Sequence, residues 1–302
     1  MSDLRFDKRV AIITGAGGGL GRSHALELAR RGAQVLVNDL GGAVDGSGSS
    51  QSAADRVVDE ITDLGGIAAA NHDSVATSEG GQAIVQAAID TFGRVDILVN
   101  NAGILRDKAF HKMDAAMIQS VIDVHLKGAL YVSQPAYRLM REQGYGRIIN
   151  TSSASGLFGN FGQANYGAAK AGLAGLTWVL ALEGASRGIK VNAIAPIAST
   201  RMTQDILGSL ADKVSPDSVS PLVAYLAHEE CAVSGHVYSV AGGRVARIFV
   251  AETQGVVLGK NTPEEIQSRL PLIDAIDRER YHLPTSLEDE TTIIAKALSE
   301  LI

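Results

Sequence analysis

The sequence predicts an α/β fold in which a doubly wound parallel sheet is covered by helices on both faces. Short apolar runs alternate along the chain with longer amphipathic segments. The apolar runs are continuous in residues such as Val and Ile, as expected for strands that are buried on both faces. Strand–helix alternation of this kind is typical of parallel βαβ units.

The strand pattern recurs throughout the first four fifths of the chain, and a helical pattern follows most of its repeats. The expected strands are residues 10–14, 34–38, 67–71, 96–100, 147–151, 190–195 and 237–240. The expected helices are residues 20–31, 52–64, 79–92, 114–142, 165–186 and 219–227. These elements define a first domain over residues 1–243. A glycine- and serine-rich segment within it, 41–52, is expected to be a mobile loop.

The segment 244–302 breaks the alternation but still carries folding signals. Thr262 begins a capping box and is followed by proline, which is favoured at the first helical position. Ile294, Leu298 and Leu301 lie at helical spacing near the end of the chain. We therefore expect a C-terminal helical extension that packs on the first domain or on a partner subunit.

Composition excludes several classes of function. The chain has 302 residues, is 46% hydrophobic and carries a net charge of −6 without a long basic run, so we expect no nucleic-acid partner. No apolar run approaches the roughly 20 residues that cross a bilayer. The first residues lack the apolar stretch of a signal peptide, and the single cysteine, Cys231, forms no internal disulfide. We expect a reducing, cytoplasmic location and no metal ion.

A glycine-rich turn links the first expected strand to the first helix. In "TGAGGGLG", Gly15, Gly19, Leu20 and Gly21 follow the strand and open the helix. Glycines allow a tight turn and close approach of a ligand to the backbone, and the helix N-terminus offers free N–H groups to a pyrophosphate. This placement predicts a dinucleotide site and a Rossmann fold.

An acidic residue at the end of the second strand predicts which dinucleotide binds. The carboxylate of Asp39 can accept hydrogen bonds from the adenosine ribose hydroxyls and repel a 2′-phosphate, which favours NAD over NADP. Arg22 is the nearby cation that would argue for NADP, and solvation on the helix surface is its alternative role.

Two more strand ends carry candidate cofactor contacts. Asp73 and Ser74 follow the third strand, where a carboxylate can accept from the adenine amino group. "NNAG" ends the fourth strand with Asn101, Ala102 and Gly103. For Asn101, contact with adenosine and a purely structural role in the sheet both remain open.

Tyr166 and Lys170 lie one helical turn apart in "YGAAK", and so share a helix face. A phenol with its ordinary pKa of about 10 is a poor base at neutral pH, but a nearby ammonium favours the phenolate. The pair therefore predicts a general acid/base for interconversion of a hydroxyl and a carbonyl group. Ser153, at the end of the fifth strand, can hydrogen-bond the substrate oxygen.

The order of these motifs resembles the short-chain dehydrogenase/reductase family over about residues 10–243, from "TGAGGGLG" to "VAGG". The resemblance implies that Tyr166 donates or accepts the proton, that Lys170 binds the nicotinamide ribose and tunes the tyrosine, and that Ser153 orients the substrate oxygen. It also implies direct hydride transfer between the substrate carbon and NAD.

The stretches "VNDLGG", "NNAGILRD", "YGRIINTSSASG" and "GNFGQANY" resemble a narrower group, the dehydrogenase units of type 2 peroxisomal multifunctional enzymes. This implies interconversion of (3R)-3-hydroxyacyl-CoA and 3-ketoacyl-CoA with NAD. A 17β-hydroxysteroid dehydrogenase is the alternative in the same class, and a non-catalytic NAD-binding interaction protein is the alternative in another. Relatives of this fold usually pair through the helices expected at 114–142 and 165–186, so we expect a homodimer or homotetramer.

The sequence departs from the family pattern at two places. Many members have asparagine, which supports a proton relay from the lysine, at the position of His125. Imidazole can also relay protons, and packing in the core is the alternative role. In "APIAS" many members have Pro-Gly, but the resemblance still implies cofactor contacts from Pro196, Ala198, Ser199 and Thr200.

The substrate side is less well defined by the sequence. Arg106 and Lys108 follow "NNAGIL", where they either meet the phosphates of CoA or are simply solvated. Leu157, Phe158 and Phe161 either line an apolar acyl or sterol pocket or pack in the core or at an interface.

Overall fold

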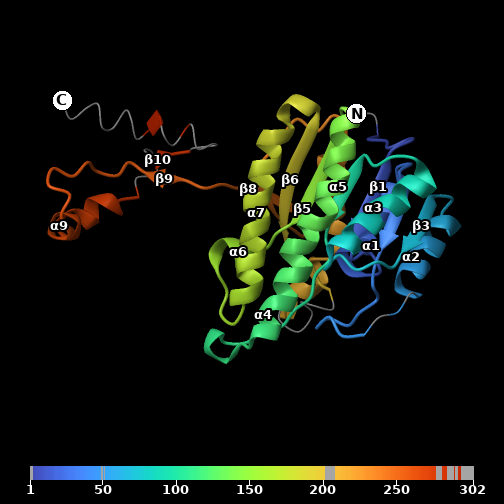
Figure 1. Ribbon diagram of the computed structural model, residues 1–302, viewed down its shortest axis with the longest axis horizontal. Coiled ribbons are helices and arrows are strands. Elements are labelled where there is room, and N and C mark those ends of the chain that lie inside the picture. The colour runs from blue at the N-terminus through green and yellow to red at the C-terminus, as the bar shows by residue number, and fades with distance from the viewer. Residues whose placement is uncertain are drawn as a thin grey trace. The chain divides into compact units, whose positions relative to one another are not determined.

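The structure is a computed structural model that describes residues 3–48, 50, 52–200, 208–276, 281–283, 289 and 292–293. The helical spacing of Ile294, Leu298 and Leu301 lies outside these residues. The main element of the structure is an eight-stranded sheet with the strand order β3-β2-β1-β4-β5-β6-β7-β8 (Figure 1). Its strands are β1 (Val10–Thr14), β2 (Gln34–Asn38), β3 (Ile67–Asn71), β4 (Ile97–Asn100), β5 (Gly146–Thr151), β6 (Ile189–Pro196), β7 (Val237–Ala241) and β8 (Arg244–Ile248).

The pairings from β3 through β7 are all parallel, which confirms the predicted sheet. Chain order runs outward from β1 in both directions, since Ile13 pairs with Val37 on one side and with Val99 on the other. The carboxyl ends of β1 and β4 therefore meet where the strand order reverses. Open α/β sheets bind ligands in the crevice at that point.

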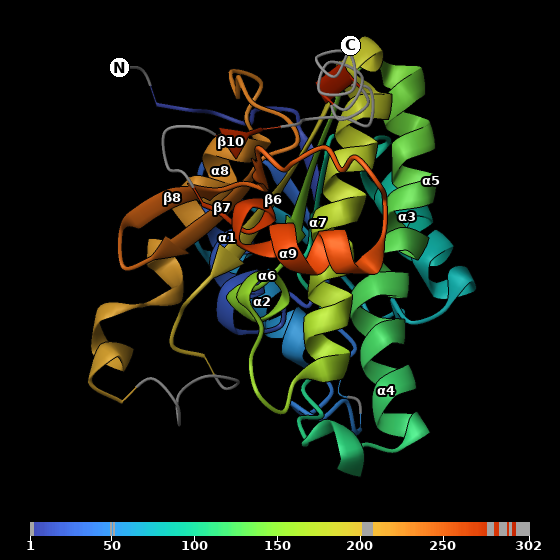
Figure 2. The same ribbon diagram turned by 90° about the vertical axis from the view of Figure 1, so that its left-hand side faces the viewer.

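Helices cover both faces of the sheet and enclose two hydrophobic cores. Residues of α1 (Gly19–Arg30), α2 (Ser52–Asp63) and α8 (Ser220–Ala227) contribute to one core. Residues of α3 (Ser78–Phe92), α5 (Gly128–Gln143) and α7 (Ala164–Gly184) contribute to the other. Figure 2 shows α5 and α7 running side by side, with α4 (Ala115–Ile122) at their lower end.

The single helix expected over 114–142 is interrupted. A π-turn over Asp123–Lys127 separates α4 from α5, and the N–H of Gly128 reaches back to the carbonyl of Asp123. Such insertions occur frequently at functional sites, because they re-aim one side chain. Here the turn contains the buried His125. The structure also adds α6 (Ala154–Phe158) and short 3₁₀ turns at Phe110–Lys112, Ala185–Arg187, Gly208–Lys213 and Pro216–Ser218.

The eighth strand was not expected from the sequence. Gly242 and Gly243 both have positive φ, 52° and 84°, as a two-residue type I′ hairpin turn requires. So short a connection joins antiparallel strands, and β8 therefore forms the edge of the sheet beside β7.

The chain divides into two compact units, one ending at Arg247 and one starting at Ile248. The second unit contains α9 (Pro263–Ile273) and an antiparallel pair, β9 (Glu252–Thr253) with β10 (Tyr281–His282). As predicted, the Thr262 side chain caps α9 by accepting the N–H of Glu265. Packing of this extension on the first domain or on a partner stays a prediction. None of the helices in the described part of the chain has the length and apolar character needed to cross a membrane.

Candidate functional site

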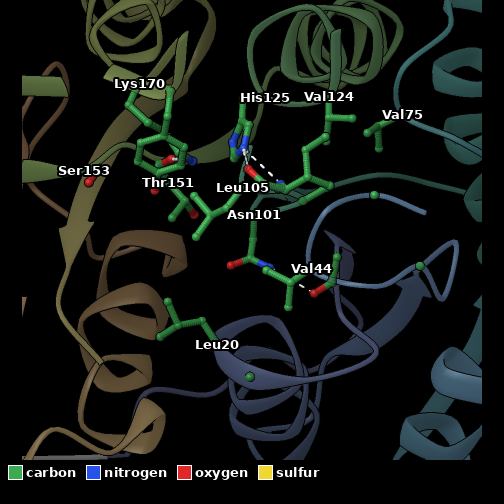
Figure 3. Close-up of a pocket in the computed structure, with 18 of the residues that line it drawn as sticks. Leu20, Val44, Val75, Asn101, Leu105, Val124, His125, Thr151, Ser153 and Lys170 are labelled. Carbon is green, nitrogen blue, oxygen red and sulfur yellow. Dashed lines mark hydrogen bonds between the residues drawn. The ribbon is translucent and has the colours of Figure 1, made fainter. Parts of the chain in front are cut away.

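A cavity of about 560 Å³ opens at the carboxyl ends of the parallel strands (Figure 3). Ser153, predicted to orient the substrate oxygen, and His125, predicted to relay protons from Lys170, both line it. Figure 3 shows His125 and Lys170 at one end of the cavity and Leu20 at the opposite end. The predicted cofactor residues that line it are Gly15, Gly19, Leu20, Asp39, Asp73, Ser74, Asn101, Ala102, Gly103, Tyr166, Lys170, Pro196, Ala198 and Thr200.

The glycine turn forms one wall of this cavity. Gly15 has φ of +65°, and a Cβ there would lie 2.7 Å from Cα of Ala102, closer than two carbons can pack. Helix α1 begins at Gly19, and its N-cap residue, Gly18, makes no side-chain capping hydrogen bond. No acidic residue occupies the first turn of the helix. Its first N–H groups are therefore available to an anionic ligand.

Two predicted cofactor residues do not line the cavity. A Cβ on Gly21 would lie 2.3 Å from the carbonyl oxygen of Gly15, so this glycine allows α1 to pack on the turn instead. Ser199 donates its backbone N–H to the carbonyl of Val214 at 2.7 Å. The structure therefore places Gly21 and Ser199 outside the lining of the cavity.

Asp39 is held by the glycine turn itself. Its Oδ2 accepts the N–H of Gly17 at 2.7 Å, and its Oδ1 accepts the N–H of Gly41 at 2.6 Å. Arg22, the cation that could have argued for NADP, is paired through two nitrogens with Glu60. Arg22 does not line the cavity.

The two other adenosine-side candidates differ in how they are held. Asp73 accepts from the side chain of Asn71 at 2.8 Å. The Nδ2 of Asn101 donates to the carbonyls of Thr14 and Gly15, each at 3.0 Å. Asn101 therefore ties β4 to the glycine turn, which is the structural role considered above, while also lining the cavity.

The three predicted catalytic side chains come together at the opposite end. Helix α7 carries both Tyr166 and Lys170, and the Lys170 Nζ lies 5.5 Å from the centre of the Tyr166 ring. Lys170 is buried, and its Nζ donates to the carbonyl of Thr151. Ser153 caps α6 and forms a side-chain hydrogen bond with Tyr166. The predicted shared face of α7 is confirmed.

The electrostatics differ from the expectation that Lys170 lowers the pKa of Tyr166. Burial raises the pKa of Tyr166, and Asp107 raises it further, while the hydrogen bond with Ser153 lowers it. Burial also lowers the pKa of Lys170 to about 7. The Lys170 Nζ lies over the face of the ring and donates to the carbonyl of Thr151, and burial is the largest cause of the shift in the pKa of Tyr166.

His125 is clamped against the backbone. Its Nε2 lies 3.0 Å from the amide nitrogen and 2.8 Å from the carbonyl oxygen of Ile104, and its ring contacts Tyr166 edge-on at 5.1 Å. Burial, aided by the charge of Lys170, lowers the pKa of His125 to about 3, so the imidazole is neutral at ordinary pH. This geometry positions the segment after β4 and the Tyr166 ring, and the relay role stays a prediction.

The glycine-rich segment expected to be a mobile loop is fastened across the cavity. Val44 accepts the N–H of Leu105 at 2.9 Å, and the Asp45 carbonyl accepts from the Arg106 guanidinium at 2.8 Å. Both Val44 and Arg106 line the cavity. Nothing in the glycine–serine composition signalled this contact, because it depends on the distant segment after β4.

On the substrate side, the apolar residues weighed as a pocket do not line the cavity. Phe158 is 72% exposed and Phe161 is 91% exposed, so neither packs in a core of the described chain. Asn160 and Gln163 line it instead. Gln163 is the N-cap residue of α7, outside the helix expected from residue 165, so helical spacing gave no signal for it.

Comparisons with known proteins agree with this site. A family model for short chain dehydrogenase matches residues 9–209. The chain is 48% identical over 297 residues to peroxisomal multifunctional enzyme A of Dictyostelium discoideum, covering 98% of this chain and 66% of that protein. It is 54% identical over 260 residues to the putative short-chain type dehydrogenase/reductase Rv0148 of Mycobacterium tuberculosis, covering 86% of this chain and 90% of that protein.

Solved structures are also similar to this chain over most of its length. Full-length peroxisomal multifunctional enzyme type 2 from Drosophila melanogaster has a TM-score of 0.83 and 37% identity, covering 99% of this chain and 51% of that one. A short chain dehydrogenase from Mycobacterium avium has a TM-score of 0.79 and 43% identity, covering 92% of this chain and 97% of that one. The chain thus spans two thirds or less of the two peroxisomal proteins.

Proposed function

The chain belongs to the short-chain dehydrogenase family, and from that premise we propose that it is an NAD-dependent (3R)-3-hydroxyacyl-CoA dehydrogenase. As a member of the family it is an oxidoreductase that acts on a CH–OH group. The observation that carries the proposal is the convergence of Ser153, Tyr166 and Lys170 on one cavity whose other end holds Asp39 and the glycine turn. Similarity to the peroxisomal multifunctional enzymes supports the acyl-CoA substrate.

The residues of the cavity fit NAD. The uncapped start of α1 would receive the pyrophosphate, and the Asp39 carboxylate would accept from the adenosine ribose. Among the described residues that line the cavity, the only arginine is Arg106 and the only lysine is Lys170, and neither lies in the segment after β2. This lack of positive charge beside Asp39 supports NAD over NADP.

The protein residues supply the proton chemistry. When bound, NAD would take the hydride from the substrate carbon. Tyr166 would accept the hydroxyl proton in oxidation and return it in reduction, while Ser153 orients the oxygen. Because burial raises the pKa of Tyr166, the phenol stays protonated at neutral pH, and oxidation should be favoured as pH rises.

Two further properties belong to the same proposal. Exposed apolar side chains on α5 and α7, among them Leu130, Val179 and Leu182, support a homodimer or homotetramer. The cytoplasmic location stays a prediction, since several relatives are named as peroxisomal proteins.

A substrate panel tests the proposal. Purified protein is assayed by NADH absorbance with (3R)- and (3S)-3-hydroxyacyl-CoA and with a 17β-hydroxysteroid. We expect turnover of the (3R)-thioester, and we expect Tyr166→Phe to lower kcat by about 100-fold or more because it removes the proton acceptor. NADH binding, followed by fluorescence, should survive that change.

Tyr225→Phe on α8, outside the cavity, is the matched control and should leave kcat unaltered. Faster turnover of the steroid would favour the hydroxysteroid alternative. NADH binding without turnover of any substrate would favour a non-catalytic dinucleotide-binding protein.

A further inference from the structure

The mouth of the cavity on the substrate side is built from two segments that hydrogen bonds join. The N–H of Lys108 donates to the carbonyl of Gly162 at 2.8 Å. The side-chain amide of Asn165 donates to the carbonyl of Arg106 at 3.1 Å. Between these bonds lies a third, from the Gln163 side chain to Asp107. The segment after β4 is therefore fixed to the start of α7.

Hydrogen-bond partners determine which way the amide of Gln163 points. The ionised carboxylate of Asp107 can only accept, so the NH₂ end of Gln163 must face it, and Nε2 lies 2.6 Å from its Oδ2. The Oε1 at the other end accepts from the side chain of Asn160 at 2.9 Å. The amide nitrogen keeps a second N–H that neither partner uses.

Gln163 lines the same cavity as Tyr166 and is the N-cap residue of α7, three residues before Tyr166. Resting on the proposed function, we propose that this second N–H of Gln163 binds the thioester carbonyl oxygen of the 3-oxygenated acyl substrate, and that Asp107 is the positioning residue that aims it. In such a substrate one methylene separates the carbon that bears the reacting oxygen from the thioester carbon. A donor at the N-cap of α7 and the Tyr166 hydroxyl on its first turn, which line the same cavity, can therefore engage both oxygens.

The charge of Asp107 adds selectivity. A neutral thioester carbonyl accepts the amide N–H without opposing that carboxylate, whereas the carboxylate of a free 3-hydroxy acid would be repelled. A simple secondary alcohol has no second oxygen to bind. The site thus selects a neutral carbonyl beside the reacting alcohol.

The test separates KM from kcat with (3R)-3-hydroxyacyl-CoA. Gln163→Leu should raise KM up to about tenfold, as expected for one lost hydrogen bond, with little change in kcat. Asp107→Asn should raise KM less than Gln163→Leu does. An amide at position 107 can both donate and accept, so it no longer holds the Gln163 side-chain amide in one orientation. Asp107→Glu, which keeps the acceptor, should recover most of the loss. Because Asp107 also raises the pKa of Tyr166, each variant is compared on the pH plateau of its own profile.

Asp90→Asn is the matched control, since it makes the same change to the acceptor of an equivalent bond, 2.7 Å long, from Gln86 on the exposed surface of α3. The control should leave KM unaltered, and the NADH Kd of every variant should match the wild type. An unaltered KM in Gln163→Leu, or an equal weakening of NADH binding, would overturn the inference. If the wild type turns over no hydroxyacyl-CoA, the proposed function itself is wrong.

Discussion

At the scale of single residues, desolvation sets the protonation states in the site. Lys170 is 3% exposed, and burial brings its pKa to about 7. The same cause raises the pKa of Tyr166 and keeps His125 neutral. The sequence could predict that Tyr166 and Lys170 share a face, because helical spacing alone decides it. It could not predict the sign of the tyrosine shift, because burial depends on the whole fold.

Asp39 gives a residue-scale prediction about cofactor choice. Asp39→Asn keeps the size of the side chain but removes the charge that opposes a 2′-phosphate. We expect the ratio of kcat/KM with NAD to kcat/KM with NADP to fall about tenfold, measured at fixed acyl-CoA concentration. Asp59→Asn, on the exposed side of α2, should leave the ratio unaltered. An unchanged ratio in Asp39→Asn would assign cofactor choice elsewhere.

At the scale of elements, prediction worked best where one periodic signal decides the structure. The strands β1, β2 and β4 to β6 are mostly buried apolar runs, and the expected ranges of all seven strands from β1 to β7 fall within a residue of the observed ones. The π-turn at Asp123–Lys127 has no such signal, because it arises from the fit of His125 against Ile104. The β8 strand was missed although Gly242 and Gly243 form a recognisable hairpin turn.

The packing of α1 on the glycine turn gives an element-scale prediction. Ala is the better helix former by about 1 kcal/mol, but a Cβ on Gly21 would lie 2.3 Å from the Gly15 carbonyl. Gly21→Ala should therefore lower both the NADH affinity and the melting temperature. In α7, Gly175 has no atom within 4 Å of the place of a Cβ. Gly175→Ala is the matched control and should raise stability by up to about 1 kcal/mol. Equal behaviour of the two variants would contradict this account.

At the scale of the whole molecule, buried histidines link folding to pH. His24 in α1 is fully buried, and its Nδ1 lies 2.8 Å from Oγ of Ser220 in α8. Burial lowers the pKa of His24 to about 3, as it does for His125. A folded-state pKa below the unfolded one gives stability that is present above about pH 6.5 and lost as pH falls toward 3.

Each of these two histidines should lower the free energy of unfolding by about 2 kcal/mol between pH 7 and pH 5. Urea unfolding at both pH values measures the difference. His24→Asn should remove about half of the decrease in the free energy of unfolding between pH 7 and pH 5, whatever the substitution does to that free energy at pH 7. His111→Asn, at an exposed position, should remove none. Identical pH dependence in His24→Asn and the wild type would show that this imidazole has the same pKa in the folded and unfolded states, and would contradict the account.

The Gly242–Gly243 hairpin has a consequence for self-association. A sheet that ended in β7 would offer its open row of backbone groups to any extended chain, and continuous Val and Ile strands form aggregates readily. The hairpin folds β8 over that row, and β8 carries Arg244 and Arg247, both exposed. A further strand joining there would have to strip water from two guanidinium groups, so the chain's own last strand acts as a gatekeeper against fibril-like stacking.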